Sequence, residues 1–127
     1  MKELKNDDGP SKGENIIVTK SYAFSVKAVR FCFEMQEKKR EFVISRQLLK
    51  SATSIGANIE EAQGAISKAE FIAKIQISLK EAKETKYWLR LIIDAEIFNS
   101  DKTPELLKDC NELIVILTSI LKTAKLK

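Results

Sequence analysis

The residues in this sequence most able to perform acid–base or metal chemistry are Glu60, Glu61 and Glu70, with Asn58 close by. Clustered carboxylates can bind Mg²⁺ or serve as general acid and base. Adjacent residues of a helix point about 100° apart, so at most one of Glu60 and Glu61 points inward beside Asn58. We therefore predict that Asn58 and Glu61 form a structural polar network. A metal-dependent enzyme that uses this pair is a remote alternative.

Other catalytic and metal-binding arrangements lack their essential residues. The sequence contains no histidine, which excludes Ser–His and Cys–His nucleophile pairs and the Glu-x-x-His motifs of carboxylate-bridged iron bundles. Its two cysteines, Cys32 and Cys110, lie far apart among apolar residues, as buried reduced thiols do. No G-x-x-x-x-G-K-[ST] phosphate-binding loop is present. We therefore expect no enzyme activity, no catalytic residue, no cofactor and no metal site.

Two groups of basic residues could contact the phosphates of a nucleic acid. One group follows the first predicted helix and consists of Lys38, Lys39 and Arg40. The other recurs every three or four residues and consists of Lys80, Lys83, Lys86 and Arg90. On a helix the second group would form a stripe about 15 Å long. Glu81 and Glu84 could pair with some of these side chains instead, and the net charge of +4 permits nucleic-acid binding without requiring it.

The composition favours a single domain built from helices. Apolar residues make up 44% of the 127 positions and charged residues 31%, which is too apolar for a disordered chain and too charged for a membrane protein. Residues 1–14 lack the apolar segment of a secretory signal, so we expect a cytoplasmic protein with no membrane partner. The sequence has only 4 glycines and 2 prolines, which is typical of an all-α protein with short connections.

Periodic apolar residues predict four helices, at about residues 21–38, 42–63, 68–98 and 104–127. Short connections between them imply an antiparallel up-down-up-down four-helix bundle over residues 15–127. The polar residues 1–14 are expected to form a disordered leader. The apolar patch Ile16–Val18 is too short for an element of its own, and we expect it to pack across a helix end or onto a neighbouring subunit.

Local signals define the connections between the helices. Gly56, among other small residues, predicts a close crossing with another helix, because it otherwise costs about 1 kcal/mol relative to alanine. Gly64 suits a left-handed helix end. Ser67 and Glu70 form an S-x-x-E capping box, which Ile66 and Phe71 flank as a hydrophobic staple. Thr103 is predicted to cap the fourth helix ahead of a proline.

The first and fourth predicted helices carry more apolar residues than one bundle seam requires. Two lines of the first helix have helical spacing: Tyr22, Val26, Val29 and Phe33, and beside them Phe24, Ala28, Phe31 and Met35. Val115 and Ile116 widen the apolar surface of the fourth. Either the seams are broad and leave aromatic side chains exposed, or these helices contact another subunit. Tyr87 and Trp88 are typical of the edge of such an interface.

Three segments give the chain a resemblance to a known family. They are K-S-Y-x-F from Lys20 to Phe24, S-I-G-A-N-I-E-E-A from Ser54 to Ala62, and S-K-A-E-F from Ser67 to Phe71. With these segments the chain resembles the 23S rRNA intervening-sequence proteins over about residues 15–125. The family typically has Asn-Ile-Ala-Glu-Gly in the central segment, so Asn58 and Glu61 match its pattern and Glu60 and Ala62 depart from it.

The resemblance implies a homopentameric ring of four-helix bundles with no established enzyme activity. A similar bundle is the accessory protein of diversity-generating retroelements, which forms a basic pentameric barrel and engages nucleic acid and a reverse transcriptase. The resemblance thus implies three partners: further copies of the chain, RNA or DNA, and a reverse transcriptase. The alternative is a purely structural or protein–protein interaction oligomer that binds no nucleic acid.

The polar network predicted for Asn58 and Glu61 has a thermal test. If these side chains hold the junction between the second and third helices, Asn58→Ala and Glu61→Ala should each lower the melting temperature. An unchanged melting temperature in both variants would contradict a structural role and favour a ligand-binding one.

Overall fold

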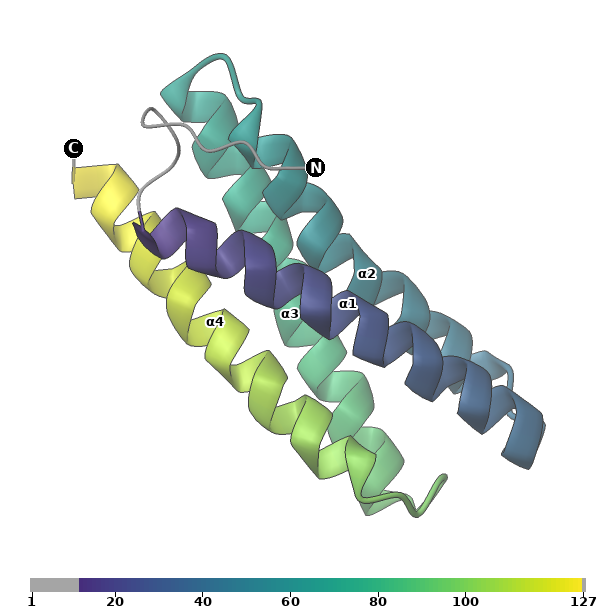
Figure 1. Cartoon of the computed structure of the whole chain (residues 1–127). Helices are drawn as coiled ribbons and strands as arrows, with labels where there is room; N and C mark the ends of the chain where they lie inside the picture. The colour runs from purple at the N-terminus through teal and green to yellow at the C-terminus, as the bar shows by residue number, and fades with distance from the viewer. Residues whose placement is uncertain (1–11, 127) are drawn as a thin grey trace.

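The computed structural model describes residues 12–126, with side chains from residue 16 onward, and this part of the chain contains helices and no strand. The four helices are α1 (Lys12–Lys39), α2 (Val43–Gln63), α3 (Lys68–Asp94) and α4 (Lys102–Leu126). Each helix reverses the direction of the one before it (Figure 1). The predicted all-α four-helix fold is confirmed. Residues 1–11 of the predicted leader lie outside the described residues.

The helices surround one core in chain order. α1 packs against α2 and α4, and α3 packs against the same two helices from the other side. All four contribute large side chains that are fully buried, among them Phe31, Leu48, Leu89 and Leu117. Every helix therefore has two neighbours, an apolar side that they cover, and an outer side that a single chain leaves uncovered.

The first helix begins earlier than predicted. The sequence indicated a start at Ser21, but α1 begins at Lys12 and includes the Ile16–Val18 patch. Ile17 is fully buried and Val18 packs against the core, so these two residues pack within their own bundle and not across a helix end. Ile16 is 44% exposed, and its contact with a neighbouring subunit stays a prediction. The β-branched residues lower helix propensity only slightly, and burial of Ile17 outweighs that cost.

The two apolar lines of α1 have different environments. Phe24, Ala28, Phe31 and Met35 are buried and form the seam. In the other line Tyr22 is 67% exposed and Phe33 is 56% exposed. Val26 and Val29 in this line are half-buried. The seam therefore extends partly onto this line, while Tyr22 and Phe33 give α1 an aromatic outer surface in the single chain.

The predicted close crossing at Gly56 is confirmed. A Cβ atom at Gly56 would lie 3.2 Å from Ser25 Oγ and 3.5 Å from the backbone oxygen of Ser21. This glycine thus lets α1 approach α2 at a distance that a larger residue would prevent.

Two hydrogen bonds made by hydroxyl groups link α2 to α3 within the core. Ser78 donates a hydrogen bond to the Ile55 carbonyl at 2.9 Å, and the hydroxyls of Thr85 and Ser51 are hydrogen-bonded at 2.8 Å. Ser51, Ser78 and Thr85 are all at most 1% exposed. These buried bonds are satisfied only in one register of the two helices, so they fix the rotation of α3 against α2.

The hairpin between α2 and α3 matches the sequence prediction in part. Glu70 N–H donates to Ser67 Oγ at 3.0 Å, as a capping box requires, although the Glu70 carboxylate accepts from Ile66 N–H rather than from Ser67 N–H. The left-handed conformation predicted at Gly64 is wrong, because its φ is −98°. Its N–H bonds to the Glu61 carbonyl at 3.1 Å, a tightened last turn that needs no positive φ. Ile66 is 92% exposed, so the staple does not form.

The connection between α3 and α4 is longer than predicted. α3 ends at Asp94, four residues early, because Glu96 takes a left-handed φ of 54° and lets Phe98 turn inward. The Phe98 ring lies 5.6 Å from that of Phe31. Thr103 does not cap α4, since Lys102 N–H bonds to Ser100 Oγ instead. The buried Thr103 hydroxyl has no partner within the described residues.

Both cysteines are free and buried in the core, as predicted. Cys110 Sγ donates to the Ala82 carbonyl at 3.2 Å, between α4 and α3. Burial raises the pKa of Cys32 from 9.0 to about 12, and it raises the pKa of Cys110 from 9.0 to about 12 as well. Neither thiol supplies a nucleophilic thiolate near neutral pH.

The close crossing predicts a strong size limit at Gly56. Gly56→Leu should lower the free energy of unfolding by about 1–3 kcal/mol, because the added side chain meets α1 and forces it outward. Gly64→Leu is the matched control: its Cβ would lie 3.8 Å from the nearest atom, an ordinary contact, so its stability should change little. Urea denaturation measures both. Equal stabilities for the two variants would contradict the crossing.

The buried thiols predict a loss of stability at alkaline pH. Unfolded thiols release their protons near pH 9, whereas the folded thiols keep them up to about pH 12. Over that range the folded state binds more protons, so the free energy of unfolding falls as pH rises from 9 to 12. Urea midpoints at several pH values should fall less steeply for Cys32→Ala/Cys110→Ala than for the wild type. Parallel pH profiles would contradict the assignment.

Candidate nucleic-acid interface

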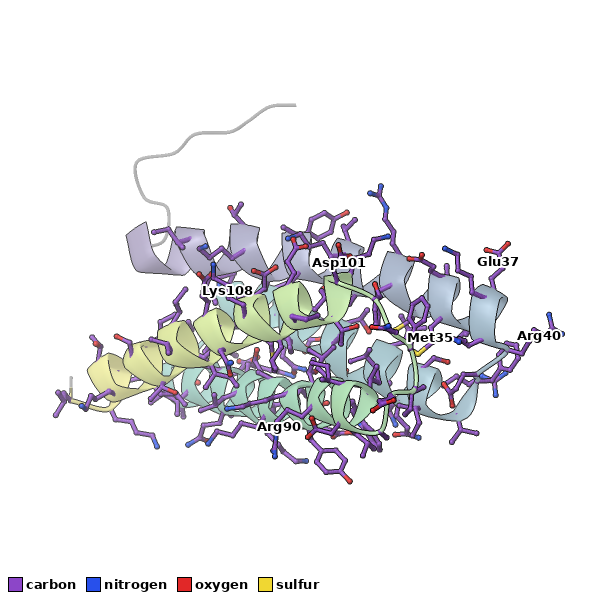
Figure 2. All side chains as sticks on the ribbon, turned by 90° about the horizontal axis from the view of Figure 1, so that it is seen from below. Met35, Glu37, Arg40, Arg90, Asp101 and Lys108 are labelled. Atoms are coloured by element: carbon purple, nitrogen blue, oxygen red, sulfur yellow. The ribbon has the colours of Figure 1, made fainter. Side chains whose placement is uncertain are left out.

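The second group of basic residues lies along the outer side of α3. We call Lys80, Lys83, Lys86 and Arg90 the basic row. Ile75, Ala82 and Leu89 are among the α3 residues that face the core. The basic row lies at other positions around the helix, so it is directed away from the core. Lys80, Lys83 and Arg90 are exposed, and Lys86 is half-buried, close enough to Cys110 of α4 for its charge to act on that thiol. The Arg90 side chain extends away from the bundle (Figure 2).

The side chains of the basic row form no ion pair with the described residues. Among the described residues, none of its four members has a carboxylate oxygen within 4 Å. The predicted alternative partner Glu84 instead accepts a hydrogen bond from Trp88 Nε1 at 3.1 Å. Some lysines elsewhere are paired, such as Lys20 with Glu112 at 3.4 Å, and others, such as Lys50, have no carboxylate partner in the described residues. The row therefore keeps four cations available to an anionic ligand.

The first group, Lys38, Lys39 and Arg40, lies at the end of the bundle where α1 turns into α2. Lys38 is paired with Glu34 at 2.9 Å, and this hydrogen bond raises the pKa of its ammonium group. The Arg40 guanidinium lies 5.8 Å from the centre of the Phe42 ring. Lys39 is exposed. Figure 2 shows Arg40 well separated from Arg90, so the two groups do not form one surface.

The ion pairs between α1 and α4 have a structural role. Lys27 contacts Glu105 at 2.9 Å and Asp109 at 3.0 Å, and these hydrogen bonds raise the pKa of Lys27. Glu34 contacts both Lys38 and Lys102, and its hydrogen bonds to them lower the pKa of its carboxyl group. Both shifts favour the ordinary charged form, which is the opposite of what a general acid or base needs near neutral pH.

Asn58 and Glu61 have separate partners. Asn58 Nδ2 donates to the Ser54 carbonyl within α2 at 2.8 Å. The Glu61 carboxylate accepts from Lys74 Nζ at 2.7 Å, which links α2 to α3 beside their hairpin. Glu60 is exposed. Among the described side chains, residues 16–126, no three acidic or cysteine side chains are grouped so that they could hold a metal ion.

Tyr87 and Trp88 form an aromatic pair beside the basic row. Their ring centres are 5.0 Å apart with an interplanar angle of 73°, an edge-on arrangement. Tyr87 is 52% exposed, and it lies four residues after Lys83 and three before Arg90. Residues at these spacings share a helix face, so the ring lies between two cations. The spacing was visible in the sequence, but the outward orientation of the ring was not.

The outer side of α4 carries one apolar area among polar residues. Val115 is 67% exposed and lines a shallow hollow of about 710 Å³ together with Pro104, Leu107 and Ile116. Lys20 and Glu112 border the hollow. The extra apolar surface predicted for the fourth helix is therefore uncovered in the single chain, like that of α1. None of the four helices in residues 12–126 combines the length and apolar character of a membrane span.

Comparisons with known proteins agree with this architecture. A solved crystal structure of a protein of unknown function from the S23 ribosomal protein family of Bacteroides thetaiotaomicron matches with a TM-score of 0.83 and 43% sequence identity. The match covers 87% of this chain and 98% of that chain. A comparison with curated proteins gave no match.

The family assignment agrees with the resemblance seen in the sequence. The family model described as 23S rRNA-intervening sequence protein matches residues 13–119, which include all or most of each helix. The chain therefore belongs to the 23S rRNA-intervening sequence protein family.

Proposed function

We propose that this protein is a non-enzymatic, self-associating helical bundle that binds RNA or DNA through the basic row of α3. The observation that carries the proposal is the set of four cations on one helix, none paired with a carboxylate in the described part of the chain. Unpaired cations are fully available to phosphate, whereas a paired lysine must first lose its carboxylate.

The length of the basic row suits a nucleic-acid backbone. Arg90 lies ten positions after Lys80, which is about 15 Å along the helix axis. One strand of duplex DNA carries a phosphate about every 3.4 Å, so the row spans about four phosphates. Binding would release the counterions of those phosphates and would weaken as salt concentration rises.

Self-association is supported by the uncovered apolar surfaces. Tyr22 and Phe33 on α1 and Val115 on α4 are each more than half exposed. Burial of such side chains between subunits would be favourable. The ring of five subunits implied by the family resemblance would repeat the basic row around the assembly. A reverse transcriptase, known from the similar retroelement bundle, is a candidate protein partner of that assembly.

The second candidate function is a purely structural or protein–protein interaction oligomer. The same exposed apolar surfaces favour it, and it needs no role for the basic row. The two candidates differ in one measurable property, which is binding of nucleic acid at low salt.

Nucleic-acid binding through the row predicts a defined salt dependence. With four phosphate contacts from one chain, log K should fall with log salt concentration with a slope of about −3 on a single strand. Lys83→Glu should weaken binding and reduce the size of that slope by about 1, since one contact is lost. Fluorescence anisotropy of labelled RNA and DNA at several salt concentrations measures both quantities.

The matched control for this prediction is Lys50→Glu. Lys50 is exposed on α2 and has no carboxylate partner in the described residues, like Lys83. Lys50→Glu changes the net charge of the chain by the same amount as Lys83→Glu. Binding by Lys50→Glu should stay close to that of the wild type. If both reversals have equal effects, net charge rather than the row controls binding. Absence of wild-type binding at about 50 mM salt would reject the nucleic-acid function in favour of the second candidate.

A further inference from the structure

The exposed ring of Tyr87 is an aromatic part of the α3 surface that the proposed function leaves unexplained. A tyrosine that is 52% exposed adds no core packing in the single chain. Along the helix axis Lys83 lies about 6 Å before it and Arg90 about 4.5 Å after it. An aromatic face between two cations, both without a carboxylate partner in the described residues, combines the two groups that bind unpaired nucleotides.

The Tyr87 ring is held in place by its neighbour. The half-buried Trp88 packs edge-on against it at 5.0 Å, and the Trp88 indole is itself fixed by a hydrogen bond to Glu84 at 3.1 Å. This contact limits the rotamers of Tyr87 before any ligand binds. Less side-chain entropy is then lost on binding than for a freely rotating surface residue.

We infer that the basic row binds single-stranded nucleic acid, with one base stacked on Tyr87 and the flanking phosphates on Lys83 and Arg90. This inference rests on the proposed function and names its ligand class. In a duplex the faces of the bases are covered by their neighbours, so a ring on the convex surface of a helix reaches only the backbone. A single strand exposes its base faces, and each accessible face can stack on an aromatic side chain.

The surrounding charges favour this ligand over an apolar protein surface. A protein partner that covered Tyr87 would also desolvate Lys83 and Arg90, which is costly unless each receives an anionic partner. A polynucleotide supplies a phosphate on either side of each base. Asp94 lies four residues beyond Arg90 on the same side of α3, so the site ends there and the strand extends from Arg90 toward Lys80.

The test compares single-stranded and duplex ligands on the full chain. Trp88 is the only tryptophan in the sequence, so its fluorescence reports events at Tyr87 without a label. The probes are an oligouridylate of about 12 nucleotides and a blunt RNA duplex of equal length. Stacking should change the Trp88 emission with the oligouridylate. Tyr87→Leu should weaken oligouridylate binding, followed by anisotropy, about 5- to 150-fold, with unchanged duplex affinity and salt slope.

Two further variants control for the loss of a tyrosine. Tyr87→Phe keeps the aromatic face and should bind the oligouridylate like the wild type. Ile77→Ala removes another exposed apolar side chain of α3, which is 41% exposed, and should leave binding unchanged. Because Tyr87 is at the surface, its variants should fold like the wild type. The helical circular dichroism and the melting temperature of each variant verify this.

The possible outcomes separate this inference from the proposed function. Stacking is overturned if Tyr87→Leu binds the oligouridylate like the wild type. It is also overturned if Tyr87→Leu loses equal affinity for the oligouridylate and the duplex. In both cases the Lys83→Glu result still decides the proposed function. A smaller solution mass for Tyr87→Leu with unchanged binding identifies Tyr87 as a subunit contact and also overturns stacking. If the wild type binds neither ligand at low salt, the inference and the proposed function both fail.

Discussion

The close packing of α2 against its two neighbours is the constraint on which the rest of the structure depends. On one side Gly56 lets α1 approach, with Ser25 Oγ 3.2 Å from where a Cβ would lie. On the other side Ser51 and Ser78 take part in buried hydrogen bonds between α2 and α3. These contacts determine the rotation of α3. The rotation in turn determines that the basic row and Tyr87 face outward and that Ala82 and Leu89 face the core.

Features of the fold that depend on neighbouring residues were predictable from the sequence. The bounds of α2, the Ser67–Glu70 cap and the close crossing at Gly56 all follow from local chemistry, because the signals lie within a few residues of their effect. The start of α1 depends on burial of Ile17 by distant helices, and the early end of α3 depends on Phe98 packing against Phe31. Such long-range contacts leave no periodic signal near the boundary that they move.

The candidate site was predictable in position but not in chemical state. Helical spacing alone places the four cations of the basic row on one helix. Whether they are paired depends on side-chain geometry. Helical spacing favours the row and Trp88 equally as partners of Glu84, and in the structure Glu84 accepts a hydrogen bond from Trp88. Asn58 and Glu61 show the reverse case, because their proximity in sequence suggested one shared network and the structure gives them different partners.

The basic row and Tyr87 lie outside the contacts that hold the helices together. Within the described residues their side chains make no ion pair between helices and do not belong to the buried core. Substitutions there can change the charge and the aromatic character of the surface with little effect on folding. Ligand preference and structural integrity are thus encoded at separate positions of α3. A relative can keep this bundle and recognise a different partner, so shared architecture in this family is a weak guide to shared ligands.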